Sequence, residues 1–156
     1  MSTPPTPPTP FPTQPLPKIP HSFMQAVARE EGFYLAHTRP QRNNNPGDIE
    51  WGKFTQAHGA TAGDPRFAIF NSADDGFACM RALFQSNGYK GLTVSQALNR
   101  WAPPVENQTN AYIANVCKWT GLTPDTVIDA ILDGPSQAAN SASTTATAPT
   151  PPATPI

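Results

Sequence analysis

The spacing of apolar residues along the chain predicts several short helices. From Phe23 to Glu31 the apolar residues recur at helical spacing, with Ser22 placed to cap the start and Gly32 placed to end the helix. Four more segments, over residues 73–84, 93–102, 107–120 and 124–134, have the same spacing. Each begins near a polar residue that can cap a helix, and these expected caps are Ser72, Thr93, Asn107 and Thr123.

Between the first two of these helices the amino-acid composition of the chain changes. This region is rich in Gly, Asn and Pro, and it holds two strand-like pieces, Asp48–Phe54 and Arg66–Phe70, joined by a polar turn region. We therefore expect a long loop followed by a small β-hairpin. The predicted fold class is α+β, mostly α, with about five helices, one hairpin and no internal repeat.

The prolines divide the chain into a centre and two tails. Nine of the twenty prolines lie in Met1–Pro20 and five lie in Pro135–Ile156. The first tail mixes Pro with Thr, which favours an extended polyproline conformation, and the second is rich in Ser, Thr, Ala and Pro and has too little apolar surface to fold. We expect disordered tails over residues 1–20 and 135–156. The remaining residues, 21–134, are enough for one domain with a modest core.

The charge of the central segment disfavours a nucleic-acid partner. It carries all eleven Asp and Glu residues and nine of the ten Lys and Arg residues, so it has no basic surface that follows a phosphate backbone. No stretch approaches the ~18 apolar residues of a transmembrane helix, and the start lacks the pattern of an ordinary signal peptide. We therefore expect a monomer that is made in the cytoplasm and has no transmembrane segment.

The cysteines and histidines do not predict a reactive or metal site. Cys79 and Cys117 lie in apolar helical patterns, where buried free thiols are the usual outcome and a disulfide the rarer one. Neither cysteine has a histidine nearby, and the three histidines lack the spacing of metal ligands. We expect no metal and no cofactor.

Two adjacent carboxylates, Glu30 and Glu31, close the first predicted helix. At about 100° per residue both lie beside the apolar face, and Glu31 lies slightly closer to it. A carboxyl group at the edge of an apolar face is desolvated, which raises its pKa and lets it act as a general acid near neutral pH. The alternative is a pair of solvated acids, although negative charge at a helix C-terminus opposes the helix dipole.

Three stretches together resemble a known family. They are "EEGF" with "RPQRNNNPGDIEWGKF", then "FAIFNSADDGFACMRAL", and then "LNRWAPPVENQTNAYIANV". In this order they are similar to phage- and prophage-associated peptidoglycan-cleaving domains of the lysozyme or lytic transglycosylase type, over most of residues 23–132. The resemblance implies a lysozyme-like fold with Glu31 as the catalytic acid. Glu30 is then a neighbour whose like charge raises the pKa of Glu31 if both face the cleft.

The resemblance places the asparagine-rich loop beside the acid. Asn43, Asn44 and Asn45 offer amide groups suited to N-acetyl sugars, or their side chains simply satisfy the loop's own backbone. Asp48 follows this loop and is either a second carboxylate across the cleft, which favours hydrolysis, or a turn residue.

The third stretch holds three further candidates for substrate binding. Trp101, beside a rigid Pro-Pro pair, is either a sugar-stacking wall or part of the core. Asn107 is first of all a helix cap that also lies in the site. Tyr112 is turned toward the catalytic acid by the family resemblance, or it belongs to the core.

The function that the resemblance implies is cleavage of the β-1,4 bond between N-acetylmuramic acid and N-acetylglucosamine in peptidoglycan glycan strands. Glu31 alone leads to a 1,6-anhydro product, whereas a second acid such as Asp48 leads to hydrolysis and a reducing end. An enzyme of this kind acts on the cell wall, in the periplasm, after phage-type lysis or another export route. The alternatives are a non-catalytic wall-binding or virion structural module, and a chitin-directed glycosidase.

Overall fold

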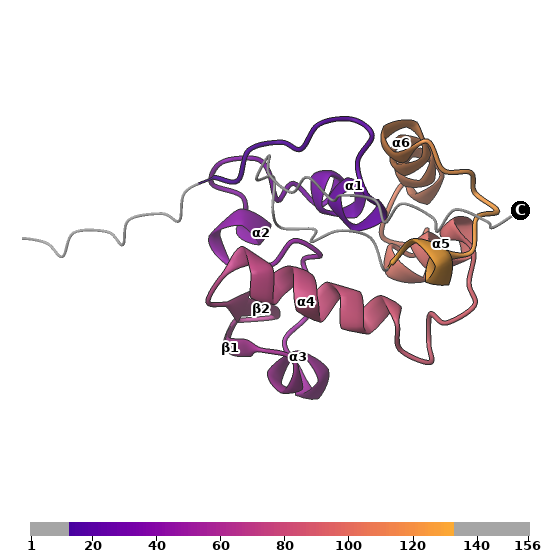
Figure 1. Ribbon diagram of the computed structural model, residues 1–156. Coiled ribbons are helices and arrows are strands. Elements are labelled where there is room, and N and C mark those ends of the chain that lie inside the picture. Colours follow the sequence, from indigo (N-terminus) through magenta and orange to yellow (C-terminus); the bar gives the residue numbers. More distant parts are fainter. Residues whose placement is uncertain (1–12, 133–156) are drawn as a thin grey trace, which may run out of the picture.

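The computed structural model describes residues 13–132, and Figure 1 shows their arrangement. Six α-helices and one two-stranded antiparallel hairpin follow one another in this part of the chain. The elements are α1 (Phe23–Glu30), α2 (Arg39–Arg42), α3 (Lys53–Ala57), β1 (Ala60–Asp64), β2 (Phe67–Phe70), α4 (Ala73–Phe84), α5 (Val94–Trp101), α6 (Thr109–Thr120) and a final 3-10 turn, η1 (Ile128–Ile131). The predicted α+β, mostly helical class is confirmed.

Helix α4 crosses the middle of the domain and separates two parts (Figure 1). Helices α1 and α6 pack on one side of it, and the hairpin lies with α3 on the other. The main core gathers fully buried side chains from the helical part, among them Val27, Met80, Leu98 and Val116. A smaller cluster of Ala60, Ala68, Phe70 and Cys79 lies under the hairpin. The hairpin is therefore fixed to the helical part through α4.

Local capping explains why three of the helices start where the sequence predicts. Ser22, Ser72 and Thr93 are the N-caps of α1, α4 and α5, and each side-chain oxygen accepts a backbone N–H of the first turn. In α1 and α5 a glutamine at the third helical position completes the capping box. These signals act within four residues, so the sequence alone is enough to locate them.

The first predicted strand is wrong. The end of the expected strand Asp48–Phe54 belongs to helix α3, which covers residues 53–57. The partner of β2 is instead β1 at Ala60–Asp64. Gly52 is the N-cap of α3, and the Thr55 hydroxyl accepts its backbone N–H at 2.9 Å, which turns the chain into a helix. The start of the expected strand still pairs beside β2: Glu50 forms an isolated bridge with Phe67, and the Ile49 carbonyl accepts the backbone N–H of Ala68 at 2.9 Å.

The last two predicted helix starts also differ from the structure. Helix α6 has Gln108 as its N-cap instead of Asn107. No helix begins at Pro124; residues 123–126 form a turn and a 3-10 helix follows at Ile128. The carbonyls of Pro124 and Thr126 accept the backbone N–H groups that open α5, so these hydrogen bonds to α5 hold the segment in a turn instead of a helix.

The two predicted tails lie mostly outside the described residues. Residues 13–20 contain no helix or strand, and Pro17 within them is buried. Both cysteines are free thiols, with Cys79 buried and Cys117 half-buried. Among residues 13–132 no helix has the length and apolar character needed to cross a membrane.

Candidate active site

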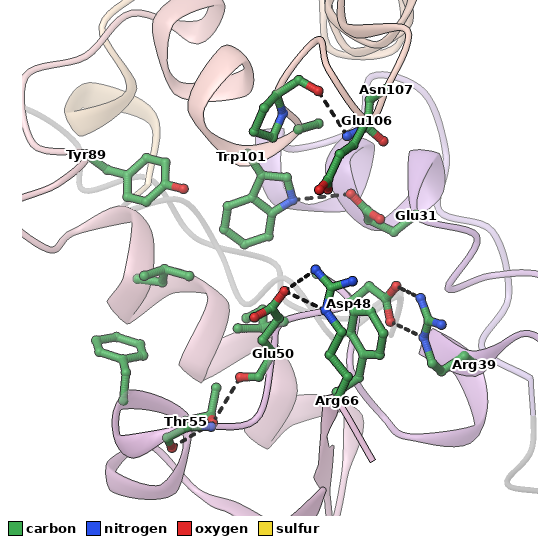
Figure 2. Close-up of a pocket in the computed structure, with 18 residues that line it drawn as sticks. Glu31, Arg39, Asp48, Glu50, Thr55, Arg66, Tyr89, Trp101, Glu106 and Asn107 are labelled. Atoms are coloured by element: carbon green, nitrogen blue, oxygen red, sulfur yellow. Dashed lines mark hydrogen bonds and ion pairs between the residues drawn. The ribbon is translucent and has the colours of Figure 1, made fainter. Parts of the chain in front are cut away.

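A cleft of about 530 Å³ lies between the helical part and the hairpin part. Figure 2 shows Glu31 and Trp101 on one wall, with Glu106 and Asn107 from the loop before α6 above them. The opposite wall carries two ion pairs, Arg39 with Asp48 and Arg66 with Glu50. The cleft therefore brings together four carboxylates, Glu31, Asp48, Glu50 and Glu106, from three separate segments of the chain.

Glu31 reaches the cleft because α1 ends at this residue. It is the C-cap of α1, and Gly32 follows at a φ of +86°, a backbone conformation that favours glycine and turns the chain away from the helix axis. The Thr38 hydroxyl donates to the Gly32 carbonyl at 2.8 Å and fixes this turn. The local sequence thus places the carboxyl group at the cleft instead of along the helix surface.

Two donors hold one oxygen of the Glu31 carboxyl group. The Tyr112 hydroxyl donates to Oε1 at 2.8 Å, and Trp101 Nε1 donates to the same oxygen at 3.2 Å. An indole N–H can only donate, so Oε1 serves as an acceptor. The proton of a neutral Glu31 therefore resides on Oε2.

Burial sets the proton affinity of Glu31. Desolvation raises its pKa from an ordinary value of 4.5 to about 7, and the nearby charges of Asp48 and Glu30 act in the same direction. The hydrogen bonds from Tyr112 and Trp101 act the other way, because they stabilise the carboxylate. Near neutral pH the group both holds and releases a proton, as a general acid must.

The raised pKa of Glu31 predicts a stability difference that depends on pH. The folded state holds the proton more tightly than the unfolded state, so its contribution is complete below pH 4.5 and is lost as the pH rises toward 7. Relative to Glu31→Gln, the wild type should lose about 3 kcal/mol of unfolding free energy over this interval. Urea unfolding of both proteins at pH 4 and pH 8 measures the difference. A constant difference between the two proteins contradicts the raised pKa.

The neighbouring Glu30 has a different setting. Its carboxylate accepts from Asn115 Nδ2 at 3.2 and 3.3 Å, on the side of α6. Partial burial raises its pKa, while the bond from Asn115 and the charge of Arg29 lower it. Glu30 is not among the residues that line the cleft. The two adjacent acids therefore have separate partners.

Asp48, for which the sequence left a second acid and a turn residue as alternatives, lies across the cleft in an ion pair. Arg39 Nε donates to Asp48 Oδ1 at 2.9 Å, and Arg39 Nη2 donates to Oδ2. Both carboxylate oxygens are thus held by one guanidinium group. The Arg39 guanidinium also lies 3.5 Å from the centre of the Phe67 ring, which fixes it from below.

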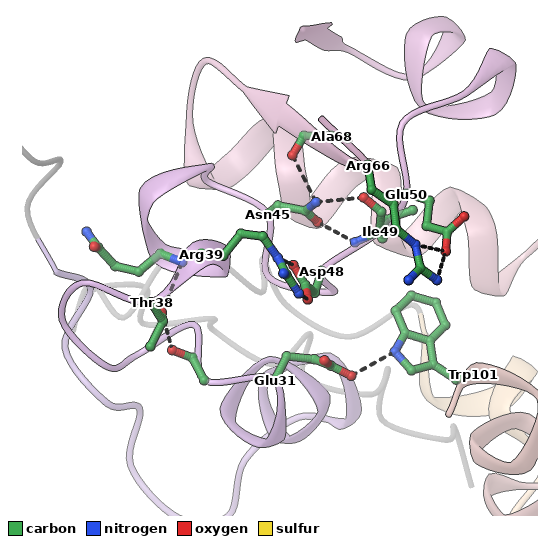
Figure 3. A network of polar contacts seen from close by, with 12 residues as sticks. Glu31, Thr38, Arg39, Asn45, Asp48, Ile49, Glu50, Arg66, Ala68 and Trp101 are labelled. Carbon is green, nitrogen blue, oxygen red and sulfur yellow. Dashed lines mark hydrogen bonds and ion pairs between the residues drawn. The ribbon is translucent and has the colours of Figure 1, made fainter. Parts of the chain in front are cut away.

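The three asparagines do not line the cleft. They are buried behind it, where Asn44 donates to the carbonyl of Phe70 and Asn45 bonds both to Ile49 and to Ala68. Figure 3 shows Asn45 joining the loop to the hairpin behind the Arg39 and Asp48 pair. The structure therefore places these side chains as supports of the wall that carries Asp48.

This placement predicts that Asn45→Ala destabilises the fold. Asn45 is fully buried and makes three hydrogen bonds to backbone groups, which would lose their partner. We expect a loss of about 3 kcal/mol in unfolding free energy. Asn43→Ala is the matched control, because Asn43 Nδ2 is buried and has no hydrogen-bond partner among the described residues. Equal losses in urea unfolding of the two variants would contradict the assignment.

Trp101 is both a wall of the cleft and part of the packing. Its ring stacks on Phe84 with centroids 4.4 Å apart, while Nε1 points to Glu31. A side chain at Gly47 would meet the indole at 2.7 Å, so glycine allows the loop to pack on this ring. Asn107 lines the cleft and donates to the Pro103 carbonyl at 3.3 Å.

The sequence interpretation missed several residues of the cleft. Arg39, Glu50, Arg66 and Glu106 all line it. Arg39 lies in the stretch "RPQR" that the resemblance includes, but its partner Asp48 is nine residues away, and Arg66 is sixteen residues from Glu50. Each pair joins two different segments of the chain, so the pairs become visible only in the folded protein.

No protein-family model matches this chain, and no curated protein matches it. In residues 13–132 no group of three His, Cys, Asp or Glu side chains has an arrangement that could hold a metal ion.

Proposed function

We propose that the protein cleaves the β-1,4 bond between N-acetylmuramic acid and N-acetylglucosamine in peptidoglycan, with Glu31 as the general acid. The observation that carries the proposal is the Glu31 carboxyl group, which lines the cleft, accepts from Tyr112 and Trp101, and has a pKa raised to about 7 by burial. Protonated Oε2 is suited to give its proton to a glycosidic oxygen.

The composition of the cleft walls supports a carbohydrate substrate. The lining combines carboxylates, guanidinium groups and an amide with the half-buried rings of Phe54, Phe67 and Trp101. Sugars offer hydroxyl and amide groups that bind polar side chains, and apolar ring faces that stack on aromatic rings. The cleft also runs between two parts of the fold, so a glycan strand has a groove with a wall on either side.

The state of Asp48 favours the reaction that needs a single acid. A carboxylate held on both oxygens by Arg39 is less available to position water or attack the anomeric carbon than a free one. In our proposal the 6-hydroxyl of the muramic acid attacks the anomeric carbon. Glu31 first donates its proton to the leaving oxygen and then accepts the proton of that hydroxyl. The product is a 1,6-anhydro sugar.

The test is incubation of the purified full-length protein with isolated peptidoglycan, with chitin oligomers in parallel, and mass spectrometry of the soluble products. The proposal predicts disaccharide-peptides with 1,6-anhydro ends. Products with reducing ends would show that the protein is a glycosidase but cleaves by hydrolysis and not by the single-acid route. Products from chitin alone reassign the substrate. Binding to peptidoglycan without any product contradicts the proposal and supports a non-catalytic wall-binding module.

A further inference from the structure

We propose that Arg39 and Asp48 form a positioning pair that sets the pH at which Glu31 exchanges its proton. The link to activity rests on the proposed function, whereas the effect on Glu31 itself does not. Figure 3 shows the pair on the wall that faces Glu31, between this residue and the asparagine-rich loop. Neither residue contacts Glu31 through a hydrogen bond that the structure records, so the influence is electrostatic.

The pair is built so that its charges stay in one place. Two parallel hydrogen bonds join the guanidinium and the carboxylate, and the Asp48 side chain is only 12% exposed. The Phe67 ring lies under the guanidinium at 3.5 Å. Asp48 has a positive φ of 47°, a backbone conformation that is accessible to Asp and Asn. A fixed charge acts on a neighbour more reproducibly than a mobile surface charge.

The groups around Glu31 come from every element that packs on it. Glu30 is its neighbour in α1, Trp101 comes from α5 and Tyr112 from α6, and Glu106 of the loop before α6 lies on the same wall of the cleft. The opposite wall contributes the charges of Asp48 and Arg39. Asp48 raises the pKa of Glu31, and the charge of Glu31 in turn stabilises the charged form of Arg39. The two members of the pair therefore shift the pKa of Glu31 in opposite directions. The salt bridge holds the two charges together, so their effects offset each other.

Because the two charges act in opposite directions, the two single variants should shift the midpoint of the Glu31 titration in opposite directions. Asp48→Asn removes a negative charge and leaves the Arg39 cation unpaired near Glu31. The carboxylate form of Glu31 is then favoured, and the midpoint of its titration falls. Arg39→Gln removes the cation and leaves Asp48 unpaired, so the midpoint rises. The double variant removes both charges and should return the midpoint toward the wild-type value. A merely structural role for the pair does not produce shifts of opposite sign.

Carbon NMR of the labelled side-chain carboxyl groups measures the midpoint directly in the intact protein, and the spectrum of Glu31→Gln identifies the Glu31 signal. We expect shifts of about one pH unit, downward for Asp48→Asn and upward for Arg39→Gln. Glu50→Gln is the matched control, because its ion pair with Arg66 lines the same cleft, is more than half exposed, and has no part in the pKa shift of Glu31. It should leave the midpoint unchanged.

Outcomes of this experiment separate the pair from the proposed reaction. Shifts of the same sign in both single variants, or no shift in either, overturn the positioning role. Asp48→Asn keeps a residue type that tolerates a positive φ, and circular dichroism checks its fold. If one variant does not fold, the sign of the shift in the other still decides. If peptidoglycan is cleaved, the alkaline limb of the pH profile of cleavage, on which Glu31 loses its proton, should move with the midpoint of the Glu31 titration. If it is not cleaved, the NMR shifts still test the pair.

Discussion

Replacing Glu31 with glutamine is expected to abolish cleavage of peptidoglycan, with a loss of about 1,000-fold or more in the rate of muropeptide release. Glutamine has the same size, and its amide oxygen still accepts from Tyr112 and Trp101, so the cleft keeps its shape. What the variant lacks is the proton on Oε2. The initial rate of soluble product release, at matched protein concentration and pH 6, measures the loss.

The adjacent acid supplies a matched control for this prediction. Glu30→Gln changes the same residue type one position earlier, but Glu30 is bound by Asn115 and does not line the cleft. We expect its rate to stay within a few-fold of the wild type, because only its charge near Glu31 is lost. Equal loss in both variants would contradict the assignment of Glu31 as the acid.

The second large effect is expected at Gly76 in α4. A Cβ atom at this position would lie 2.0 Å from the carbonyl oxygen of Asn44 and 2.6 Å from Pro46 Cδ. Alanine normally stabilises the interior of a helix by about 1 kcal/mol relative to glycine. Here Gly76→Ala must push the loop off the helix, and we expect a loss of about 3 kcal/mol in unfolding free energy.

Gly52→Ala is the control for the effect at Gly76. No heavy atom lies within 4 Å of the added Cβ at Gly52, and its backbone is extended, so alanine is accommodated. Urea unfolding of the two variants compares the close approach with an open position. The loop that Gly76 supports also carries Asp48, so Gly76→Ala should disturb the ion pair with Arg39 as well. A Gly76→Ala protein as stable as the wild type would contradict this packing.

Helices α1, α4 and α5 and the candidate acid were accessible from the sequence because their signals are local. Capping residues such as Ser22 and Thr93 act on the next turn of their own helix. Helical geometry alone places Glu31 closer to the apolar face than Glu30, and the structure gives Glu31 the stronger burial effect on pKa. The bond from Tyr112, 81 residues away in sequence, was indicated only by the resemblance, and the bond from Trp101, 70 residues away, was not predicted.

The hairpin and its supports required the folded chain. The segment after Asp48 has strand-like composition, but the cap at Gly52 and Thr55 turns it into a helix, a competition that composition does not settle. The role of Asn45 depends on Ala68, which is 23 residues away. An asparagine that binds sugar and one that binds a distant backbone carbonyl look the same in sequence, since both offer the same amide.

The central claim is that the fold turns Glu31 into an acid that keeps its proton near neutral pH. The most direct test is titration of the Glu31 carboxyl carbon by NMR in the wild-type, full-length protein, with Glu31→Gln used to assign the signal. The structure predicts a midpoint of about 7, set mainly by desolvation. A midpoint near the ordinary value of 4.5 would contradict the claim, because such a group is fully ionised at neutral pH and has no proton to give.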